Sequence, residues 1–279
     1  MHPVISNLLA RQNKKVPVGD GRNLALVLFG GTMVGVRGAG ALVALQELGL
    51  TGAFDQIYTM SSGFSNGTSF LAGQAHLTAA IYYQKLSGSR FLNFFRFWKI
   101  ADVEYLLRVV RETAFDVEKI LESRTKLYNM LVNVSKNGRH EHLEVHDYGA
   151  KEFFDLLRAS LSVKYIAGGS VKIGDNVYHD SITGKAVTDF FSHVLSGGAT
   201  DILVIYNYAW QRDHVRKNFP RLDAGRVYEI CPDAGTARGG FLQKLSRFET
   251  RARVLKEHCR LSGNETKRIF GSLEPVTLI

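Results

Sequence analysis

The sequence is poor in cysteine and lacks any long apolar run. It has only Cys231 and Cys259, in unrelated surroundings, and two free thiols are typical of a protein in a reducing compartment. No stretch reaches the roughly 18 uncharged apolar residues that a membrane-spanning helix needs. The first residues lack the basic start and apolar block of a signal peptide. These absences predict a cytoplasmic protein, for which any contact with a membrane would be peripheral.

Motifs for common cofactors, metals and nucleic acids are also missing. The Gly-rich turn at residues 30–35 (GGTMVG) has Thr32 where the dinucleotide motif G-x-G-x-x-G needs its second glycine. No G-x-x-x-x-G-K-[ST] phosphate loop occurs, and no helix-turn-helix, zinc or RNA-recognition motif. Three histidines and an aspartate gather at residues 140–147, but without a second ligand cluster a surface strand is the better interpretation. We therefore expect neither a cofactor nor a metal.

Positive charge is in excess. The chain has 35 Lys and Arg against 26 Asp and Glu, a net charge of +9, which favours anionic partners without choosing among them. Residues 238–268 alone hold nine basic residues against three glutamates. A basic, helical C-terminal extension over residues 236–279 follows from this pattern. It is either a solvated face or a surface that docks on an anionic membrane, while nucleic-acid binding is the weaker alternative.

Hydrophobic patterning indicates an α/β fold. An apolar run at 24–29, a Gly-rich turn, a helix at about 37–48 and a short strand at 57–59 form a βαβ unit, which implies a mainly parallel sheet with helices on both faces. Further strands are predicted at 127–134, 140–145, 170–173, 176–179, 201–207 and 226–230. Residues 1–22 are interpreted as a polar basic lead-in, and residues 75–130 as mostly helical. The aromatic run at 91–98 fits a cap packed on the core better than a lid or a lipid-facing surface.

A candidate nucleophile follows the strand at 57–59. Ser61 lies in the sequence T-M-S-S-G, between that strand and a helix-like segment at 65–73. This order is typical of a nucleophile elbow, a sharp strand-to-helix turn that exposes one serine. Small residues are favoured two positions to either side of the serine. Gly63 meets that requirement, and Thr59 does not.

Such a serine needs a base and donors for an oxyanion. The backbone amides of Gly30 and Gly31 can supply the donors, although a lone Gly-rich loop could also hold a phosphate. A Ser-His-Asp triad could use His179 beside Asp180, but neighbours on a strand point to opposite faces. A dyad in which Asp180 contacts Ser61 directly is the other route. Asp180 could also be only a turn former.

Together these parts resemble the patatin-like phospholipases. That family orders a Gly-rich oxyanion loop, a G-x-S-x-G elbow and a distant Asp-Gly-Gly or Asp-Gly-Ala motif, and the resemblance here spans residues 23 to about 231. It implies a three-layer α/β sandwich over residues 23–235 and a Ser61–Asp180 dyad without a catalytic histidine. It also implies an oxyanion hole from the amides of Gly30, Gly31 and Thr32. The implied activity is hydrolysis of acyl-lipid esters through an acyl-enzyme, as in phospholipase A or lysophospholipase.

Each of the three motifs departs from the family pattern. Thr32 and Thr59 replace glycines, Val34 replaces a basic residue, and Ser181 follows the aspartate where the family has glycine. A catalytically inactive lipid-binding or scaffold protein with the same fold is therefore the alternative function. A binder of nucleic acid or anionic surfaces, driven by charge, is a further one.

Overall fold

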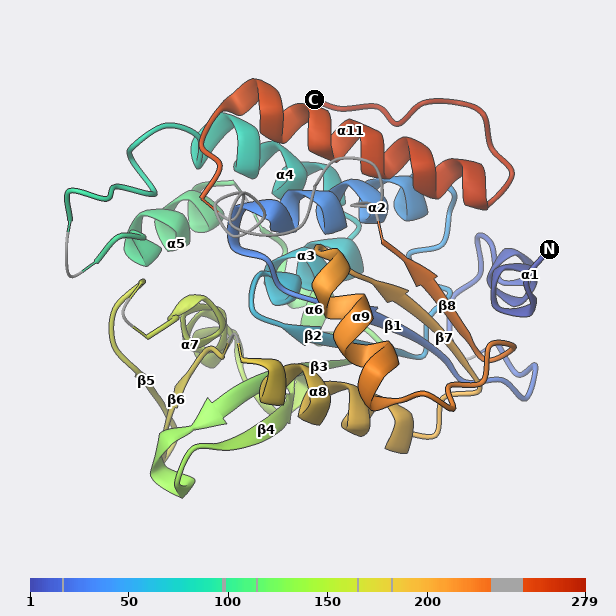
Figure 1. The fold of residues 1–279 in the computed structure, drawn as a ribbon, viewed down its shortest axis with the longest axis horizontal. Helices are drawn as coiled ribbons and strands as arrows, with labels where there is room; N and C mark the ends of the chain where they lie inside the picture. The colour runs from blue at the N-terminus through green and yellow to red at the C-terminus, as the bar shows by residue number, and fades with distance from the viewer. Residues whose placement is uncertain (17, 97–98, 114, 165, 182, 232–247) are drawn as a thin grey trace.

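A computed structural model describes residues 1–279 except 17, 97–98, 114, 165, 182 and 232–247 (Figure 1). In the described residues, eight strands form one sheet in the order β5-β6-β3-β2-β1-β7-β8, with β4 paired to β3. Strands β3, β2, β1, β7 and β8 run parallel, and β4, β5 and β6 add antiparallel pairs. The strands are β1 (Leu24–Leu28), β2 (Gln56–Met60), β3 (Lys126–Asn133), β4 (Arg139–Glu144), β5 (Val171–Ile173), β6 (Asn176–His179), β7 (Asp201–Ile205) and β8 (Val227–Ile230). The predicted mainly parallel sheet is confirmed.

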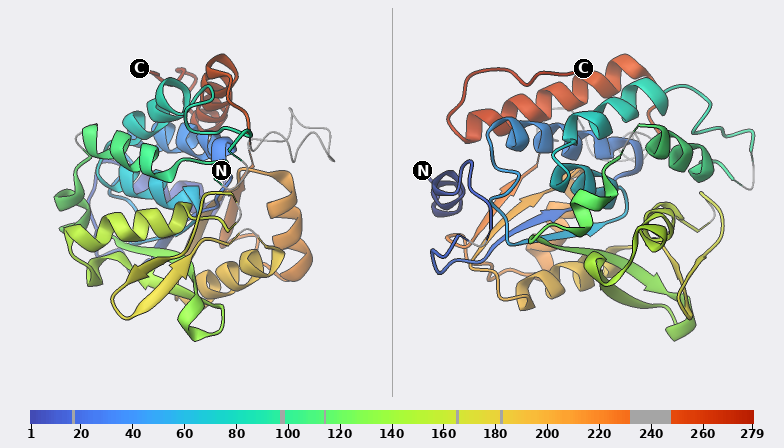
Figure 2. Two further views of the ribbon diagram at one scale, coloured as in Figure 1. Left: turned by 90° about the vertical axis from the view of Figure 1, so that its left-hand side faces the viewer. Right: turned by 180° about the vertical axis from the view of Figure 1, so that it is seen from behind.

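Helices cover both faces of this sheet, because alternate side chains of a strand point to opposite faces. Along β1, Leu24, Leu26 and Leu28 join one apolar core, while Ala25 and Val27 join another. The first core lies under α1 (Pro3–Ala10), α2 (Gly35–Glu47), α3 (Ser62–Leu71), α4 (Ala75–Ala80), α5 (Val103–Glu112), α6 (Val117–Leu121), α7 (Ala150–Leu161) and α11 (Ala252–Ile269). The second lies under α8 (Gly184–Ser196) and α9 (Ala209–Asn218), and Figure 2 shows α7 and α9 on opposite sides of the sheet. The fold is an α/β sandwich.

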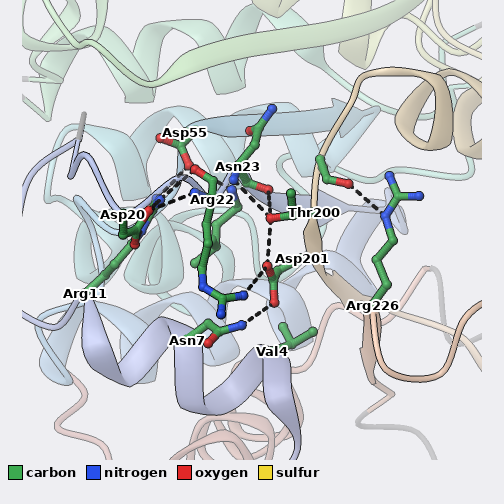
Figure 3. A network of polar contacts seen from close by, with 12 residues as sticks. Val4, Asn7, Arg11, Asp20, Arg22, Asn23, Asp55, Thr200, Asp201 and Arg226 are labelled. Atoms are coloured by element: carbon green, nitrogen blue, oxygen red, sulfur yellow. Dashed lines mark hydrogen bonds and ion pairs between the residues drawn. The ribbon is translucent and has the colours of Figure 1, made fainter.

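The N-terminal segment is packed against the domain, which the interpretation of residues 1–22 as a lead-in did not predict. Helix α1 buries Val4, Ile5 and Leu8. Arg11, only 1% exposed, follows this helix and forms ion pairs of 2.6 Å with both Asp20 and Asp55 (Figure 3). A buried guanidinium needs such partners, since an unpaired buried charge is strongly destabilising. The segment therefore belongs to the folded body.

The expectation of a mostly helical stretch at residues 75–130 is only partly correct. A π-helical turn, η2 (Ile81–Lys85), follows α4, and the described residues 86–96 and 99–102 lie outside helices and strands before α5 begins. Phe91 and Leu92 are buried, as predicted for a cap on the core, whereas Phe94 and Phe95 are exposed. The last two aromatic residues of this run, at 97 and 98, lie outside the described residues.

Helix α11 packs closely on α2. A Cβ atom added to Gly40 would lie 2.1 Å from the carbonyl oxygen of Cys259, so only a glycine permits this approach. The basic C-terminal segment is thus helical over Ala252–Ile269, as predicted, and part of the body, while its beginning at 236–247 lies outside the described residues. Within the described chain, no helix has both the length and the apolar character needed to cross a membrane.

Candidate active site

The predicted turn at Ser61 is present. Strand β2 ends at Met60, helix α3 begins at Ser62, and Ser61 between them has φ 54° and ψ −136°. A non-glycine residue at positive φ is uncommon, and such strain persists only where the surroundings fix it. Ser61 is therefore held by the fold at the carboxyl end of a central strand.

Glycines allow the backbone to close around this turn. A Cβ atom on Gly63 would lie 2.4 Å from the carbonyl oxygen of Leu28. This steric clash explains the predicted requirement for a small residue at position 63. Thr59 occupies the other small-residue position and is fully buried. Its Oγ1 donates to the carbonyl oxygen of Tyr128 at 2.7 Å, and its methyl group faces Gly67 of α3, where an added Cβ would approach to 2.8 Å. The bulk of Thr59 is accommodated because Gly67 has no side chain.

Strand register brings Asp180 to this turn. Strand β2 ends where Met60 pairs with Met130 of β3, and β6 approaches antiparallel along the same edge of β3, with His179 opposite Val132. Because β2 and β6 meet nearly end to end on one edge of β3, the residues that follow them, Ser61 and Asp180, converge. Both line one pocket.

The Asp180 carboxyl group is buried, with 3% of the residue exposed. Its Oδ1 accepts the Ser181 amide at 2.7 Å, and its Oδ2 receives no hydrogen bond of good geometry from the described residues. Burial raises the pKa of Asp180 to about 7, although the nearby Ser61 hydroxyl and the Ser181 amide lower it in part. The predicted alternative, His179, has Nδ1 2.6 Å from the Asp180 carbonyl oxygen instead of its carboxyl group. A carboxyl group with a pKa near neutrality suits proton transfer.

The Gly-rich loop lies beside Ser61. A Cβ atom on Gly30 would lie 2.3 Å from Ser61 Cβ and 2.8 Å from its Oγ. Thr32 has φ 53°, another positive value that explains why glycine would suit this position. The amides of Gly30 and Thr32 have no acceptor among the described residues, but the Gly31 amide donates to Ser62 Oγ at 2.9 Å. Two of the three predicted oxyanion donors are thus unoccupied, and the third is engaged.

Two buried polar residues after β7 fix this loop, and the sequence analysis did not identify them. Asn207 donates through Nδ2 to the carbonyl oxygen of Phe29 at 2.5 Å, and Gln211 donates through Nε2 to that of Gly30 at 2.8 Å. The Gln211 side chain also accepts the backbone amide of Asn207 at 3.0 Å. The signal in the sequence was the position of these two residues: Asn207 comes soon after the apolar strand β7, and Gln211 follows it by four residues.

Two hollows meet at Ser61. The first is mainly apolar; besides Ser61 and Asp180 it is lined by Met33, Ile81, Tyr82, Leu86, Phe91, Leu106, Val110, Phe115, Leu157, Leu161 and Ile166, among others. The second is lined by the loop glycines together with Tyr208 and Trp210. A mainly apolar lining with a few polar groups is typical of sites for small organic ligands.

The other candidate residues lie elsewhere. His140 forms a 2.6 Å contact with Asp189 of α8, and the His142 ring stacks on His193. Within the described residues, no group of three or more potential ligands could hold a metal ion. Both cysteines are buried and neither forms a disulfide in the described structure, and burial raises the pKa of the Cys259 thiol to about 12, which disfavours the reactive thiolate.

Comparisons with known proteins add little to this geometry. No family model matches the chain, and no curated protein matches it. Among the solved structures that match the chain is VipD from Legionella pneumophila, at 9% sequence identity and a TM-score of 0.43. The alignment covers 92% of this chain and 69% of the VipD chain. A similarity of this strength carries no argument about function, which must therefore rest on the site itself.

Proposed function

We propose that the protein hydrolyses carboxylic esters of acyl lipids, with Ser61 as the nucleophile and Asp180 as the base. One observation carries the proposal: a serine at a strained strand-to-helix turn and a buried carboxyl group line the same apolar pocket. Nucleophile and base must lie close together for the hydroxyl to be activated.

In the proposed reaction, Asp180 accepts the Ser61 hydroxyl proton while Oγ attacks the ester carbonyl carbon. The resulting oxyanion would lie against the Gly30 and Thr32 amides, for which the described part of the chain offers no acceptor. The C–O bond to the alcohol then breaks, and the alcohol leaves with the proton held by Asp180. Water then gives a proton to Asp180 as its oxygen attacks the acyl-enzyme carbonyl. The Ser61–acyl bond breaks, Asp180 returns that proton to Ser61 Oγ, and the fatty acid is released.

The two hollows suit the two halves of such an ester. The apolar pocket would hold the acyl chain, because burial of each methylene contributes about 0.8 kcal/mol. The second hollow, on the Gly30 side of Ser61, would hold the alcohol. Among the described residues, neither hollow is lined by a lysine or arginine that could balance the charge of a phosphate, so a phosphate cradle is the poorer interpretation of the Gly-rich loop.

The engaged Gly31 amide favours a second candidate, a lipid-binding protein without turnover. If the Gly31–Ser62 hydrogen bond persists with substrate, the oxyanion has one donor fewer than predicted. Removal of one such donor reduces kcat by about 10²–10³ in other enzymes. Both candidate functions therefore involve binding of acyl lipids, and they differ in the rate at which the bound ester is hydrolysed.

A serine-directed fluorophosphonate probe and a chromogenic short-chain ester test the proposal. The wild type should react with the probe at Ser61, located by peptide mass spectrometry, and should turn the ester over. Ser61→Ala and Asp180→Asn should lose both reactions, whereas Ser196→Ala, at the far end of α8, should keep them. Unchanged turnover in Ser61→Ala would overturn the assignment, and absence of turnover by folded wild type across several acyl esters and phospholipids would favour the silent binder.

A further inference from the structure

Between η2 and α5, the described residues 86–96 and 99–102 lie outside helices and strands and display aromatic side chains to solvent; we call these two stretches the aromatic loop. Phe94 is 53% exposed and Phe95 88% exposed. Figure 1 shows the described parts of this loop extending outward from the body beside α4 and α5. Large adjacent apolar side chains at a protruding tip commonly mark an interaction surface.

Hydrogen bonds hold the aromatic loop in this shape. The Arg96 guanidinium donates to the carbonyl oxygens of Arg90 and Phe91 at 3.1 and 2.9 Å, and to the Asp102 carboxylate at 3.1 Å. These bonds tie the two ends of the loop together. The exposure of the phenylalanines is therefore a property of an organised segment.

A second set of bonds fixes the tip itself. The Asn93 side chain accepts the Phe95 amide at 2.9 Å, and the Asn93 amide donates to the Ile100 carbonyl oxygen at 2.8 Å. The rings of Phe94 and Phe248 make a T-shaped contact with their centroids 5.3 Å apart. Phe95 has no comparable ring contact in the described residues.

Basic side chains lie next to the aromatic loop. A surface groove beside the loop is lined by Lys85, Arg90 and Arg108, with Glu112 as its single acidic residue. The three basic residues are exposed, and Arg90 lies over the Tyr105 ring at 4.8 Å. Apolar rings that insert at the acyl boundary, with cations at the level of the headgroups, are typical of proteins that bind anionic membranes from one side.

The aromatic loop is continuous with the candidate active site. Phe91 and Ala101, near its two ends, line the apolar pocket that contains Ser61. A membrane at the tip would therefore lie beside the wall of the proposed acyl pocket.

We propose that Phe94 and Phe95 insert into the surface of a membrane that contains anionic lipids, with Lys85, Arg90 and Arg108 contacting its headgroups. The surface thus differs from the basic C-terminal helix that the sequence analysis considered for this role. We choose a lipid surface as the binding partner because it has two matching regions. Its acyl region would accept the exposed aromatic rings, and its anionic headgroups would attract the basic side chains. Membrane binding does not require turnover. The proposal therefore rests on the proposed function only for the reason why the protein would bind a membrane.

Vesicle sedimentation with the full chain tests the docking surface, with Ser61→Ala as the background so that no lipid is consumed. The protein should partition onto vesicles of phosphatidylcholine mixed with phosphatidylserine more strongly than onto phosphatidylcholine alone. Phe94→Ser/Phe95→Ser should lower the partition coefficient at least about tenfold, because two phenylalanine insertions are lost. Arg90→Gln/Arg108→Gln should remove most of the preference for phosphatidylserine.

Leu273→Ser is the matched control, since Leu273 is 90% exposed but follows the far end of α11. It should bind as the background does. Equal binding by the phenylalanine variant and the background, or no binding by the background to either vesicle, would overturn the docking surface and point to a protein partner instead.

A second measurement separates this proposal from the proposed function. With Ser61 intact, Phe94→Ser/Phe95→Ser should keep turnover of a dissolved short-chain ester and lose turnover of vesicle phospholipid at least about tenfold. Vesicle binding that depends on the phenylalanines in a wild type without turnover would leave the docking surface standing and refute the hydrolase. Equal loss of both activities would contradict a docking role.

Discussion

Asp180 should make the protein less stable as the pH rises. Its carboxyl pKa is raised from 3.8 to about 7, chiefly because burial disfavours the charged form. Between these values the folded protein retains a proton that the unfolded chain releases, so the free energy of unfolding falls as pH increases. Each pKa unit corresponds to about 1.36 kcal/mol, so the loss reaches up to about 4 kcal/mol above pH 7.

Asp180→Asn removes this titration with little change in shape. The variant should unfold at a higher urea concentration than the wild type at pH 8, where the wild-type carboxylate is charged and buried. At pH 4 the wild-type group is protonated in the folded state, and the difference should be small. The same substitution should abolish ester turnover, because the amide cannot accept the Ser61 proton.

Urea unfolding followed by circular dichroism at pH 4, 6 and 8 measures this effect, with Asp175→Asn in the exposed β5–β6 turn as the control. For the wild type, kcat/KM on a dissolved ester should also rise with pH through about 7, as the base loses its proton. A stability difference between Asp180→Asn and wild type that does not change with pH would refute the reasoning.

Three other substitutions test separate parts of the structure. Gly30→Ala should lower kcat/KM at least about a hundredfold at unchanged circular dichroism, because its Cβ would lie 2.3 Å from Ser61 Cβ and must displace the turn. Arg11→Met should reduce the free energy of unfolding in urea by about 3 kcal/mol, since it leaves Asp20 and Asp55 without their partner. Val110→Trp should fill the apolar pocket, so that a series of esters of increasing chain length shows loss for long chains and retention for acetyl esters.

Local patterns in the sequence were sufficient for the central strands and for the turn at Ser61. The run at 24–29 and the following glycines predicted β1 and its loop, and T-M-S-S-G predicted the strand-to-helix turn. The order of these elements implied a parallel sheet, which the structure confirms. Such signals arise from residues that are neighbours along the chain.

Contacts between distant segments were not predictable in the same way. Asn207 and Gln211 form hydrogen bonds with the Gly-rich loop, which lies about 180 residues earlier in the sequence. Arg11 likewise forms an ion pair with Asp55, which belongs to a separate segment of the chain. The hydrogen bond between the Gly31 amide and Ser62 also depends on the approach of two loops. The catalytic roles of Ser61 and Asp180 themselves remain predictions.

Thr59 and Gly67 share one small space in the elbow, and substitutions at both positions test this. Thr59 stands where the elbow pattern has glycine, and its methyl group occupies space that Gly67 leaves open. Gly67→Ala should therefore destabilise the protein by about 1–3 kcal/mol, because its Cβ would lie 2.8 Å from that methyl carbon. Thr59→Ser removes the methyl and keeps the hydroxyl bond to Tyr128, so the double variant should recover at least about 0.5 kcal/mol relative to additivity in urea unfolding. Additive effects would mean that the two positions do not share one space, and that Thr59 is tolerated in this turn for another reason.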